Sequence, residues 1–240
     1  MKKILKENTL LEMSIFEHLE ELRSRILIAL IFFIITTAVC FIYIDQISCI
    51  LQQPAKGIKF IQLAPGEYLF ASIKVTIYTS ILITSPFTIY QIVRFILPGL
   101  TKQESLYIIP ILGSSIALFY IGLLFSYKIL APAALHFLIK YGSNIVEPIW
   151  SFEEYISFIL ILLFSTGIIF QVPILQIVLG IFNIISSTRM LAYSKYMIFI
   201  STIVSAVITP STDPITQIIL ALALILLYLS GIMILKIINK

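Results

Sequence analysis

The chain has 240 residues, of which 60% are hydrophobic and only 12% are charged. Its mean hydropathy of +1.07 is far above that of a soluble domain of the same length, which excludes an ordinary soluble fold. Lysines at the N-terminus are followed by several glutamates before the first apolar run, a pattern that fits neither a secretory signal nor an acid-poor transit peptide. If the protein works in an organelle, we therefore expect it to be made there.

The apolar runs predict an all-α integral membrane protein with one membrane domain, residues 1–240. A bilayer core requires about 20 apolar residues per helix, and the runs between charges and helix breakers give six predicted spans. These are residues 26–44, 69–92, 106–130, 155–179, 191–209 and 215–235. The fifth is apolar without a break only from about Tyr196, and a short turn joins it to the sixth, so we expect two short helices in a tight hairpin.

Proline and glycine mark where the predicted helices stop or bend. Residues 45–68 and 131–150 contain several of them and are expected to form loops, because proline removes a backbone donor and blocks a continuous helix. Pro86, Pro110 and Pro173 lie inside predicted spans, where they should bend the helices. A bent set of helices could enclose a concave face.

Three residue pairs have the spacing of a capping box, in which each side chain accepts a hydrogen bond from an orphan N–H at a helix start. The pairs are Ser14 with Glu17, Thr101 with Glu104, and Ser151 with Glu154. They predict helices that begin near Ile15 and ahead of the third and fourth spans. Asp213 directly precedes Pro214, which is the order of an N-cap followed by a proline at the first helical position. We therefore favour a capping role for Asp213 over a catalytic one.

The distribution of basic residues predicts the orientation. With the N-terminus inside, most of the sixteen lysine and arginine residues lie on the inner side, so both termini are expected to be inside. This orientation places Glu20, Glu21 and Glu104 on the inner face, and Glu67 and Asp213 on the outer face.

The densest cluster of charge is residues 18–25, directly before the first apolar run. On a helix, Glu21 lies four residues before Arg25 and Glu20 lies three residues before Arg23, so each acid has a basic neighbour. One interpretation is a solvated, self-paired helix start, since exposed pairs contribute little to stability. The other is a carboxylate site at the membrane surface for a cationic partner. The pattern alone leaves both open.

Gln171 is the clearest polar residue at membrane depth. It precedes Pro173, which frees the carbonyl of Ile169, so the glutamine could satisfy that kink or bond to another helix. We favour these roles over a substrate contact. The sequence contains no nucleotide-binding, metalloprotease or serine-hydrolase motif and no pair of intramembrane acids. We therefore expect no enzyme activity, cofactor, metal site or nucleic-acid partner.

Motifs in one order along nearly the whole chain resemble the TatC family, a subunit of the twin-arginine, or Sec-independent, protein translocase. They are residues 16–25, 63–70, 97–100, 119–122, 170–173 and 209–210, together with Phe95, Glu104, Asp213 and Gln217. The resemblance implies a cupped bundle of six helices. It also implies transport of folded proteins, driven by the proton motive force, after recognition of a signal peptide with two adjacent arginines.

The resemblance assigns residues to this recognition. Glu21 and Glu104 match the acids that bind the signal peptide, and Arg23 and Phe95 match positions that shape the site. The residue types suit the role, because guanidinium groups bind carboxylates in a fork geometry. One departure is Gln171, where many relatives carry glutamate, so a charge at this depth is not required here.

Partners and location also follow from the resemblance. Thr209 and Gln217 match polar positions at which family members bind single-span subunits of the TatA and TatB type. Self-association and contact with membrane lipids are expected as well. We favour a plastid thylakoid membrane over a bacterial cytoplasmic membrane. The alternative functions are a small-solute secondary transporter and an assembly factor for a membrane complex.

Overall fold

The structure, a computed structural model, describes residues 15–96, 102–142, 149–209 and 213–238, and these are almost entirely helical. The longer helices are α1 (Ile15–Ile42), α3 (Glu67–Ile96), α4 (Lys102–Phe125), α6 (Phe152–Ile169) and α10 (Pro214–Ile237). The shorter ones are α2 (Ile44–Gln52), α5 (Ala131–Gly142), α7 (Val172–Ile181), α8 (Ser187–Ala192) and α9 (Ser194–Ile208). A 3-10 turn η1 (Gln53–Ala55), a π-helical segment η3 (Ser126–Leu130) and the strands β1 (Lys59–Ile61) and β2 (Ile149–Ser151) join them.

Within these residues, five helical segments are long and apolar enough to cross a membrane. They are Phe16–Ile42, Glu67–Phe95, Ile108–Tyr141, Phe152–Ile181 and Pro214–Ile237. A sixth apolar helix, α9, has 15 residues and is shorter, as its sequence predicts, but its hairpin partner α10 has 24 residues and is not the short helix that we expected. The prediction of an all-α integral membrane protein is confirmed.

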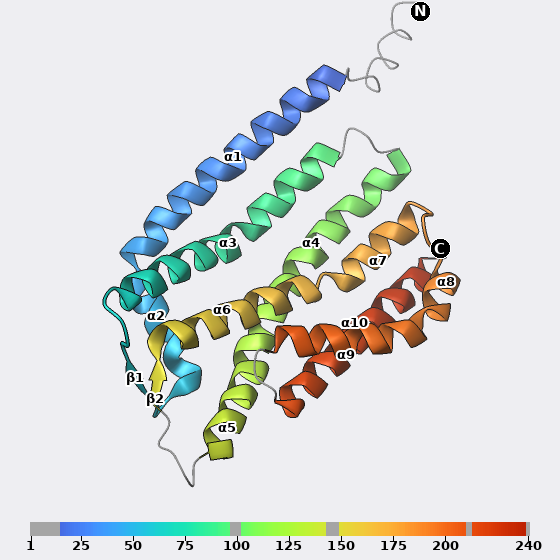
Figure 1. Ribbon diagram of the computed structural model, residues 1–240. Helices are drawn as coiled ribbons and strands as arrows, with labels where there is room; N and C mark the ends of the chain where they lie inside the picture. The colour runs from blue at the N-terminus through green and yellow to red at the C-terminus, as the bar shows by residue number, and fades with distance from the viewer. Residues whose placement is uncertain (1–14, 97–101, 143–148, 210–212, 239–240) are drawn as a thin grey trace, which may run out of the picture.

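Figure 1 shows α1 and α3 as an antiparallel pair along one edge of the molecule, followed by α4, α6 with α7, and the α9–α10 hairpin. α1 begins, α3 ends, α4 begins and α7 ends at the same end of the bundle. We name this end the N-side; it carries Glu21 and Phe95. The opposite end, the far side, carries α2, both strands and the start of α6, with Glu67 and Tyr155.

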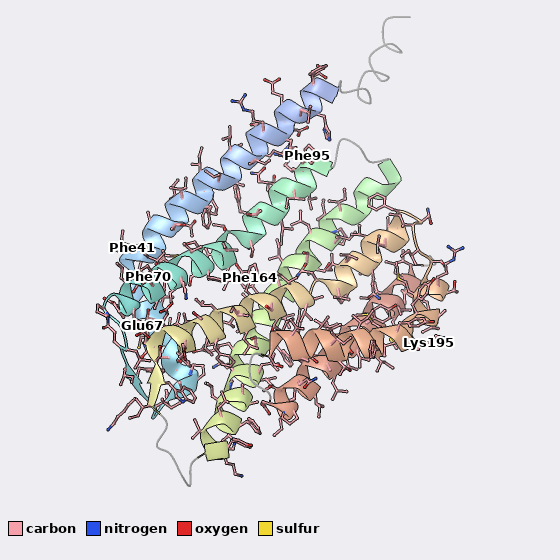
Figure 2. All side chains as sticks on the ribbon, in the orientation of Figure 1. Phe41, Glu67, Phe70, Phe95, Phe164 and Lys195 are labelled. Carbon is pink, nitrogen blue, oxygen red and sulfur yellow. The ribbon has the colours of Figure 1, made fainter. Side chains whose placement is uncertain are left out.

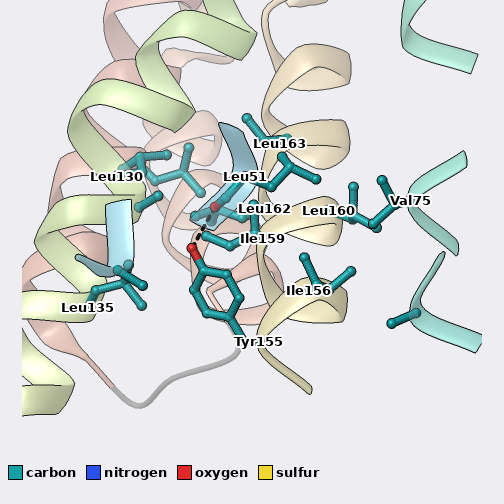
Figure 3. Close-up of a cluster of buried hydrophobic side chains, with 14 of the residues drawn as sticks. Leu51, Val75, Leu130, Leu135, Tyr155, Ile156, Ile159, Leu160, Leu162 and Leu163 are labelled. Carbon is teal, nitrogen blue, oxygen red and sulfur yellow. Dashed lines mark hydrogen bonds between the residues drawn. The ribbon is translucent and has the colours of Figure 1, made fainter. Parts of the chain in front are cut away.

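The core centres on α6, whose buried side chains pack against α2, α3 and the π-helical segment (Figure 3). Ile156 and Ile159 of α6 are fully buried, and the Tyr155 hydroxyl donates to the carbonyl oxygen of Leu51 at 2.7 Å. This bond satisfies a carbonyl near the end of α2, where helix carbonyls lack internal partners. In contrast, only 6% of the most apolar window of α1 is buried, against 56% for the α6–α7 segment. α1 is therefore held mainly by α3.

The loop predicted at 45–68 is wrong over its first part, residues 45–55, and right over residues 56–66, which form turns and the short strand β1. α2 continues almost directly from α1 after Tyr43, and Pro54 lies in the 3-10 turn that follows it. The segment is helical because Leu51 is buried and Ile44 and Ile47 pack against the same core. The apolar positions at helical spacing outweigh Pro54, which lies just after α2, whereas Gly57, Pro65 and Gly66 lie in the part that is a loop as predicted.

The predicted loop at 131–150 is also wrong over its first half. The helix of α4 passes through the π-helical segment into α5, where the Ala131 N–H donates to the Ser126 carbonyl. Pro132 lies inside this continuous helix, directly after the π-helical segment, where the regular pattern of helical hydrogen bonds is already interrupted. Strand β2 occupies the end of the same predicted loop.

The prolines inside the spans act in different ways. α3 runs through Pro86 without a break, and the carbonyl of Leu82, which loses its helical donor to the proline, accepts the Ser85 hydroxyl at 2.8 Å and the Tyr120 hydroxyl at 3.4 Å. α4 likewise contains Pro110. The break predicted near Pro173 is confirmed, because α6 ends at Ile169 and α7 begins at Val172.

The far side is held together by one buried carboxylate, that of Glu67 (labelled in Figure 2). Its Oε2 accepts the backbone N–H groups of Leu63 at 2.6 Å and Ala64 at 3.1 Å. Its Oε1 accepts the Ser151 hydroxyl and the Glu153 N–H. Beside it, β1 and β2 pair in parallel. Glu67 thus joins the start of α3 to the start of α6.

Candidate functional site

Glu21 and Arg25 form an ion pair on consecutive turns of α1, at the N-side. Arg25 donates from Nε to Glu21 Oε1 at 3.0 Å, and its Nη2 bonds the same oxygen. Each side chain is only about one-fifth exposed, at 19% for Glu21 and 20% for Arg25. The second carboxylate oxygen, Oε2, is buried and has no hydrogen-bond partner in the part of the chain that the structure describes. The site therefore holds a carboxylate with one oxygen in an ion pair and the other buried and unpaired among the described residues.

Two contacts join this part of α1 to the end of α3. Arg25 Nη1 donates to Gln91 Oε1 at 3.2 Å, and Gln91 is buried. The rings of His18 and Phe95 stack with their centroids 4.2 Å apart. Figure 2 shows Phe95 at the end of α3 that faces the start of α1. The ion pair is thus fixed against a second helix, unlike a freely solvated pair.

Two hollows open on either side of Arg25. The first, the acidic hollow, has a volume of about 470 Å³ and is lined by Glu17, Glu20, Glu21, Ser24, Arg25 and Ile28. The second, the apolar groove, has a volume of about 670 Å³ and lies between α1 and α3. Its α1 wall includes Leu22, Ala29 and Phe33, and its α3 wall includes Ile81 and Gln91. A ligand with a cationic end and an apolar continuation would fit the two together.

The electrostatics of the acidic hollow favour a cation. Three carboxylates line it against one guanidinium, and that guanidinium is already bound to Glu21. Charge-assisted bonds between arginine and carboxylate are among the strongest in proteins, and a partly buried site strengthens them further. The arrangement can therefore bind guanidinium groups.

The structure brings together some of the predicted site residues. The predicted Glu21–Arg25 pair is confirmed, whereas Glu20 and Arg23 are both exposed and form no ion pair in the described part of the chain. Phe95 lies beside the ion pair in the apolar groove. α4 begins at Lys102, so the backbone of Glu104 is in its first turn on the N-side, but its side chain lies outside what the structure describes.

Ser14 and Thr101, the first residues of the first two predicted capping boxes, lie outside the described residues. The third is confirmed in part: α6 begins at Phe152, and the Ser151 hydroxyl accepts the Glu154 N–H at 3.3 Å.

Gln171 bonds to another helix. Its Oε1 accepts the Ser115 hydroxyl at 2.5 Å, and its Nε2 donates to the Ser115 carbonyl at 3.1 Å. The break between α6 and α7 is thereby tied to α4. Of the roles considered for Gln171, the structure shows the bond across helices.

The remaining predicted residues lie around the turn between α9 and α10. Asp213 is the N-cap of α10, since its carboxylate accepts the N–H groups of Ile215 at 2.9 Å and Thr216 at 3.3 Å. Thr209 is buried, and its hydroxyl donates to Ser205 in its own helix at 2.7 Å. Gln217 reaches from α10 to the carbonyl of Thr202 in α9 at 3.4 Å. These three residues are far along the chain from the Glu21 site and belong to the hairpin.

Sequence reasoning missed Gln91 as a partner of Arg25. The available signal is its spacing of four from Phe95, which puts both side chains on one face of α3. That spacing says nothing about which helix the face meets, so the contact with α1 could not be derived from it.

Comparisons with known proteins agree with this arrangement. The family model for TatC, the Sec-independent protein translocase protein, matches residues 17–222. A protein of Gracilaria tenuistipitata var. liui, named uncharacterized tatC-like protein ycf43, is 66% identical over 229 residues, which cover 95% of this chain and 96% of that protein. The chloroplastic Sec-independent protein translocase protein TATC of Pisum sativum is 46% identical over 222 residues, which cover 92% of this chain and 63% of that protein.

Among solved structures, a crystal structure of the twin-arginine translocase receptor TatC in DDM matches with a TM-score of 0.79 at 38% identity, covering 91% of this chain and 99% of that one. Sequence, family model and fold agree over almost the whole chain. The chain therefore belongs to the TatC family of Sec-independent protein translocase proteins.

Proposed function

We propose that this chain is the signal-peptide receptor and core subunit of a twin-arginine protein translocase, which moves folded proteins across an energised membrane using the proton motive force. The observation that carries the proposal is the Glu21 carboxylate, which lies partly buried in the wall of the acidic hollow at the N-side and has one oxygen without a hydrogen-bond partner among the described residues. An arginine of the signal peptide would donate to this oxygen. Membership of the TatC family supports the reading, and the solute-transporter and assembly-factor alternatives are not favoured by it.

The second arginine of the pair would bind Glu104. The support is its place in the chain: the first turn of α4 lies at the same end of the bundle as Glu21 (Figure 1). Arg23, exposed one turn from the ion pair, and Phe95, stacked on His18, would shape the site. Carboxylates on two separate helices suit two adjacent arginines better than one carboxylate would, since each guanidinium needs its own fork of acceptors.

The apolar groove would receive the part of the signal peptide that follows the arginines. Signal peptides carry an apolar segment of about 7–15 residues after their basic region. The groove begins at Arg25 and Gln91 and continues along α1 to Phe33. Eight residues of helix span about 12 Å, which matches the first part of such a segment. A cation site that opens into an apolar groove fits this order of residues.

The chain is a multi-pass membrane protein, and its relatives include a chloroplastic translocase protein. We place it in the thylakoid membrane as a single membrane domain of six spans, with α9 as the fifth, and with the N-side facing the stroma. The N-side carries Arg23, Arg25 and Arg94, and an excess of basic residues is typical of the inner, non-translocated side of a membrane protein.

The partners would be the signal peptides of folded passengers and single-span subunits of the TatA and TatB type. For the latter we propose the α9–α10 hairpin, in which Gln217 makes only a long bond of 3.4 Å to Thr202 and could exchange it for a bond to another helix. Thr209 is buried and would support this surface from within.

Binding of a twin-arginine signal peptide to the full chain in lipid nanodiscs tests the receptor function. We expect Glu21→Gln to weaken binding about tenfold or more, because it removes the charge from a charge-assisted hydrogen bond. Glu154→Gln is the matched control, since Glu154 is an exposed carboxylate near the start of α6 on the far side. Equal affinities of wild type and Glu21→Gln, with both proteins folded, would refute the assignment.

A further inference from the structure

Arg25 already bonds one of the two oxygens of the carboxylate that an arginine of the signal peptide would bind. Its Nε and Nη2 both bond Glu21 Oε1, and its Nη1 bonds Gln91. We infer that Arg25 is a resident competitor at Glu21 that makes the site selective for arginine over lysine. The inference rests on the proposed receptor function and adds a specificity-determining residue to it.

The hydrogen-bonding capacity of the carboxylate shows how the competition works. A carboxylate has about four acceptor positions, two on each oxygen. Arg25 fills those of Oε1 with two donors, while Oε2 is buried without a partner in the described residues. An incoming cation therefore meets a half-occupied carboxylate that already has a positive group beside it. It must share Glu21 with Arg25 or displace it.

Arginine and lysine differ in their ability to do this. A guanidinium group is planar, delocalised and weakly hydrated, so it can approach another guanidinium and bind Oε2 with directed donors. An ammonium group is compact and strongly hydrated, so it loses more hydration free energy in a site that is only about one-fifth exposed. The positive charge of Arg25 also repels an incoming ammonium group, which can offset this repulsion with fewer directed hydrogen bonds than a guanidinium group can.

Gln91 makes displacement of Arg25 feasible. Its buried amide oxygen holds Nη1 from the α3 side, independently of Glu21. Arg25 also lines the apolar groove with Leu22 and Ile26, so its aliphatic stem has apolar neighbours whether or not it is paired. When a peptide arginine takes Glu21, Arg25 can keep its bond to Gln91 and remain between the helices.

The test compares peptides with twin arginine and twin lysine on wild type, Arg25→Gln and Arg94→Gln in nanodiscs. In Arg25→Gln, both oxygens of Glu21 become open, so we expect the twin-lysine peptide to bind about threefold to tenfold more tightly. The ratio of the two dissociation constants should fall by about threefold or more. Arg94 is an exposed arginine in the last turn of α3 that lies over the Tyr90 ring. Removing its charge controls for net electrostatics and should leave the ratio unchanged.

An unchanged ratio in Arg25→Gln, or equal weakening of both peptides, would overturn the inference and leave Arg25 as a residue that only positions Glu21. Thermal unfolding of each variant verifies folding, and Arg25→Lys serves if Arg25→Gln does not fold. Lysine keeps the charge but cannot hold Oε1 twice and Gln91 at once, so it should also lower the ratio. Glu21→Gln separates the receptor function from the role of Arg25. If Glu21→Gln has no effect on peptide binding, the receptor function fails. If Glu21→Gln weakens binding but Arg25→Gln leaves the ratio unchanged, only the role of Arg25 fails.

Discussion

Gln171 shows how one residue can join three helices inside a membrane. Its amide accepts from the Ser115 hydroxyl and donates to the Ser115 carbonyl. The break between α6 and α7 is thus bonded to α4 by both halves of one side chain. An ionised glutamate could accept but not donate, so the pair of bonds requires a neutral group with a donor.

A double-mutant cycle on Gln171→Leu and Ser115→Ala measures this contact. We expect each single variant to lower the free energy of unfolding by about 1–3 kcal/mol, because a buried polar group loses its partner. The coupling energy should be about 0.5–1.5 kcal/mol, measured by thermal unfolding in detergent. Because alanine keeps the backbone carbonyl that Gln171 Nε2 bonds, strict additivity of the two substitutions would show that the hydroxyl bond contributes nothing to stability.

Gln171→Glu adds a test of charge at the same position. We expect a lower Tm than wild type, with recovery at acidic pH, where a protonated carboxyl could again donate to the Ser115 carbonyl. A Tm equal to that of wild type at neutral pH would contradict the need for a neutral donor.

Bonds within one helix were predictable only in part at this scale, since Glu20 and Arg23 have a suitable spacing but form no ion pair among the described residues, and bonds between helices were not predictable. Glu21 with Arg25, and Ser151 with the Glu154 N–H, follow from spacings of four and three along the chain. The contacts of Gln91 with α1 and of Ser115 with Gln171 depend on which helices are neighbours, and spacing along one helix carries no information about that.

At the scale of secondary structure, Glu67 connects three segments on the far side. The β1–α3 connection supplies two backbone donors, and β2 with the start of α6 supplies two more. An ion pair between Lys74 and Glu153, at 2.6 Å, lies beside it. The short parallel strands pair over only three residues, and this contact would be weak without these bonds, since a small isolated sheet is marginal.

Glu67→Gln tests this connection. Glutamine replaces one accepting oxygen of Glu67 by an NH₂ group, which would then face at least one backbone N–H donor. We therefore expect the free energy of unfolding to fall by about 1–3 kcal/mol. Glu154→Gln, an exposed neighbour, should change it by less than about 0.5 kcal/mol. Thermal unfolding of the two variants side by side gives the comparison. Equal Tm values would mean that the carboxylate of Glu67 is dispensable.

The same scale shows where sequence patterns mispredict helices. Proline and glycine predicted loops at 45–68 and 131–150, yet α2, the π-helical segment and α5 occupy much of them. Pro54 lies beyond α2, and Pro132 directly follows the π-helical segment, where the regular helical hydrogen bonds are already interrupted. The predicted loops were too long, because burial of Leu51, Leu130 and Leu135 stabilises helices next to these prolines and glycines.

For the whole molecule, apolar run length predicted the all-helical membrane fold and the short helix α9, whereas the prediction that the sixth span is also short was wrong, since α10 has 24 residues. The bundle arrangement was accessible only through the resemblance to TatC. It places α1 at an exposed edge, where its contact with α3 forms both the ion-pair site and the apolar groove. Such a position leaves the groove open to a peptide that enters from the lipid side.

Site-specific photocrosslinking to a twin-arginine signal peptide in membranes tests receptor function at this site most directly. Photoreactive side chains would replace Ser24 in the acidic hollow, Ala29 in the apolar groove, and Ala38, an exposed α1 residue outside both hollows, as the control. We expect adducts at Ser24 and Ala29 but not at Ala38, with loss of both when the peptide arginines become lysines and weakening in Glu21→Gln. Adducts that form equally at all three positions, or that ignore both changes in a folded and inserted protein, would contradict a signal-peptide site between α1 and α3.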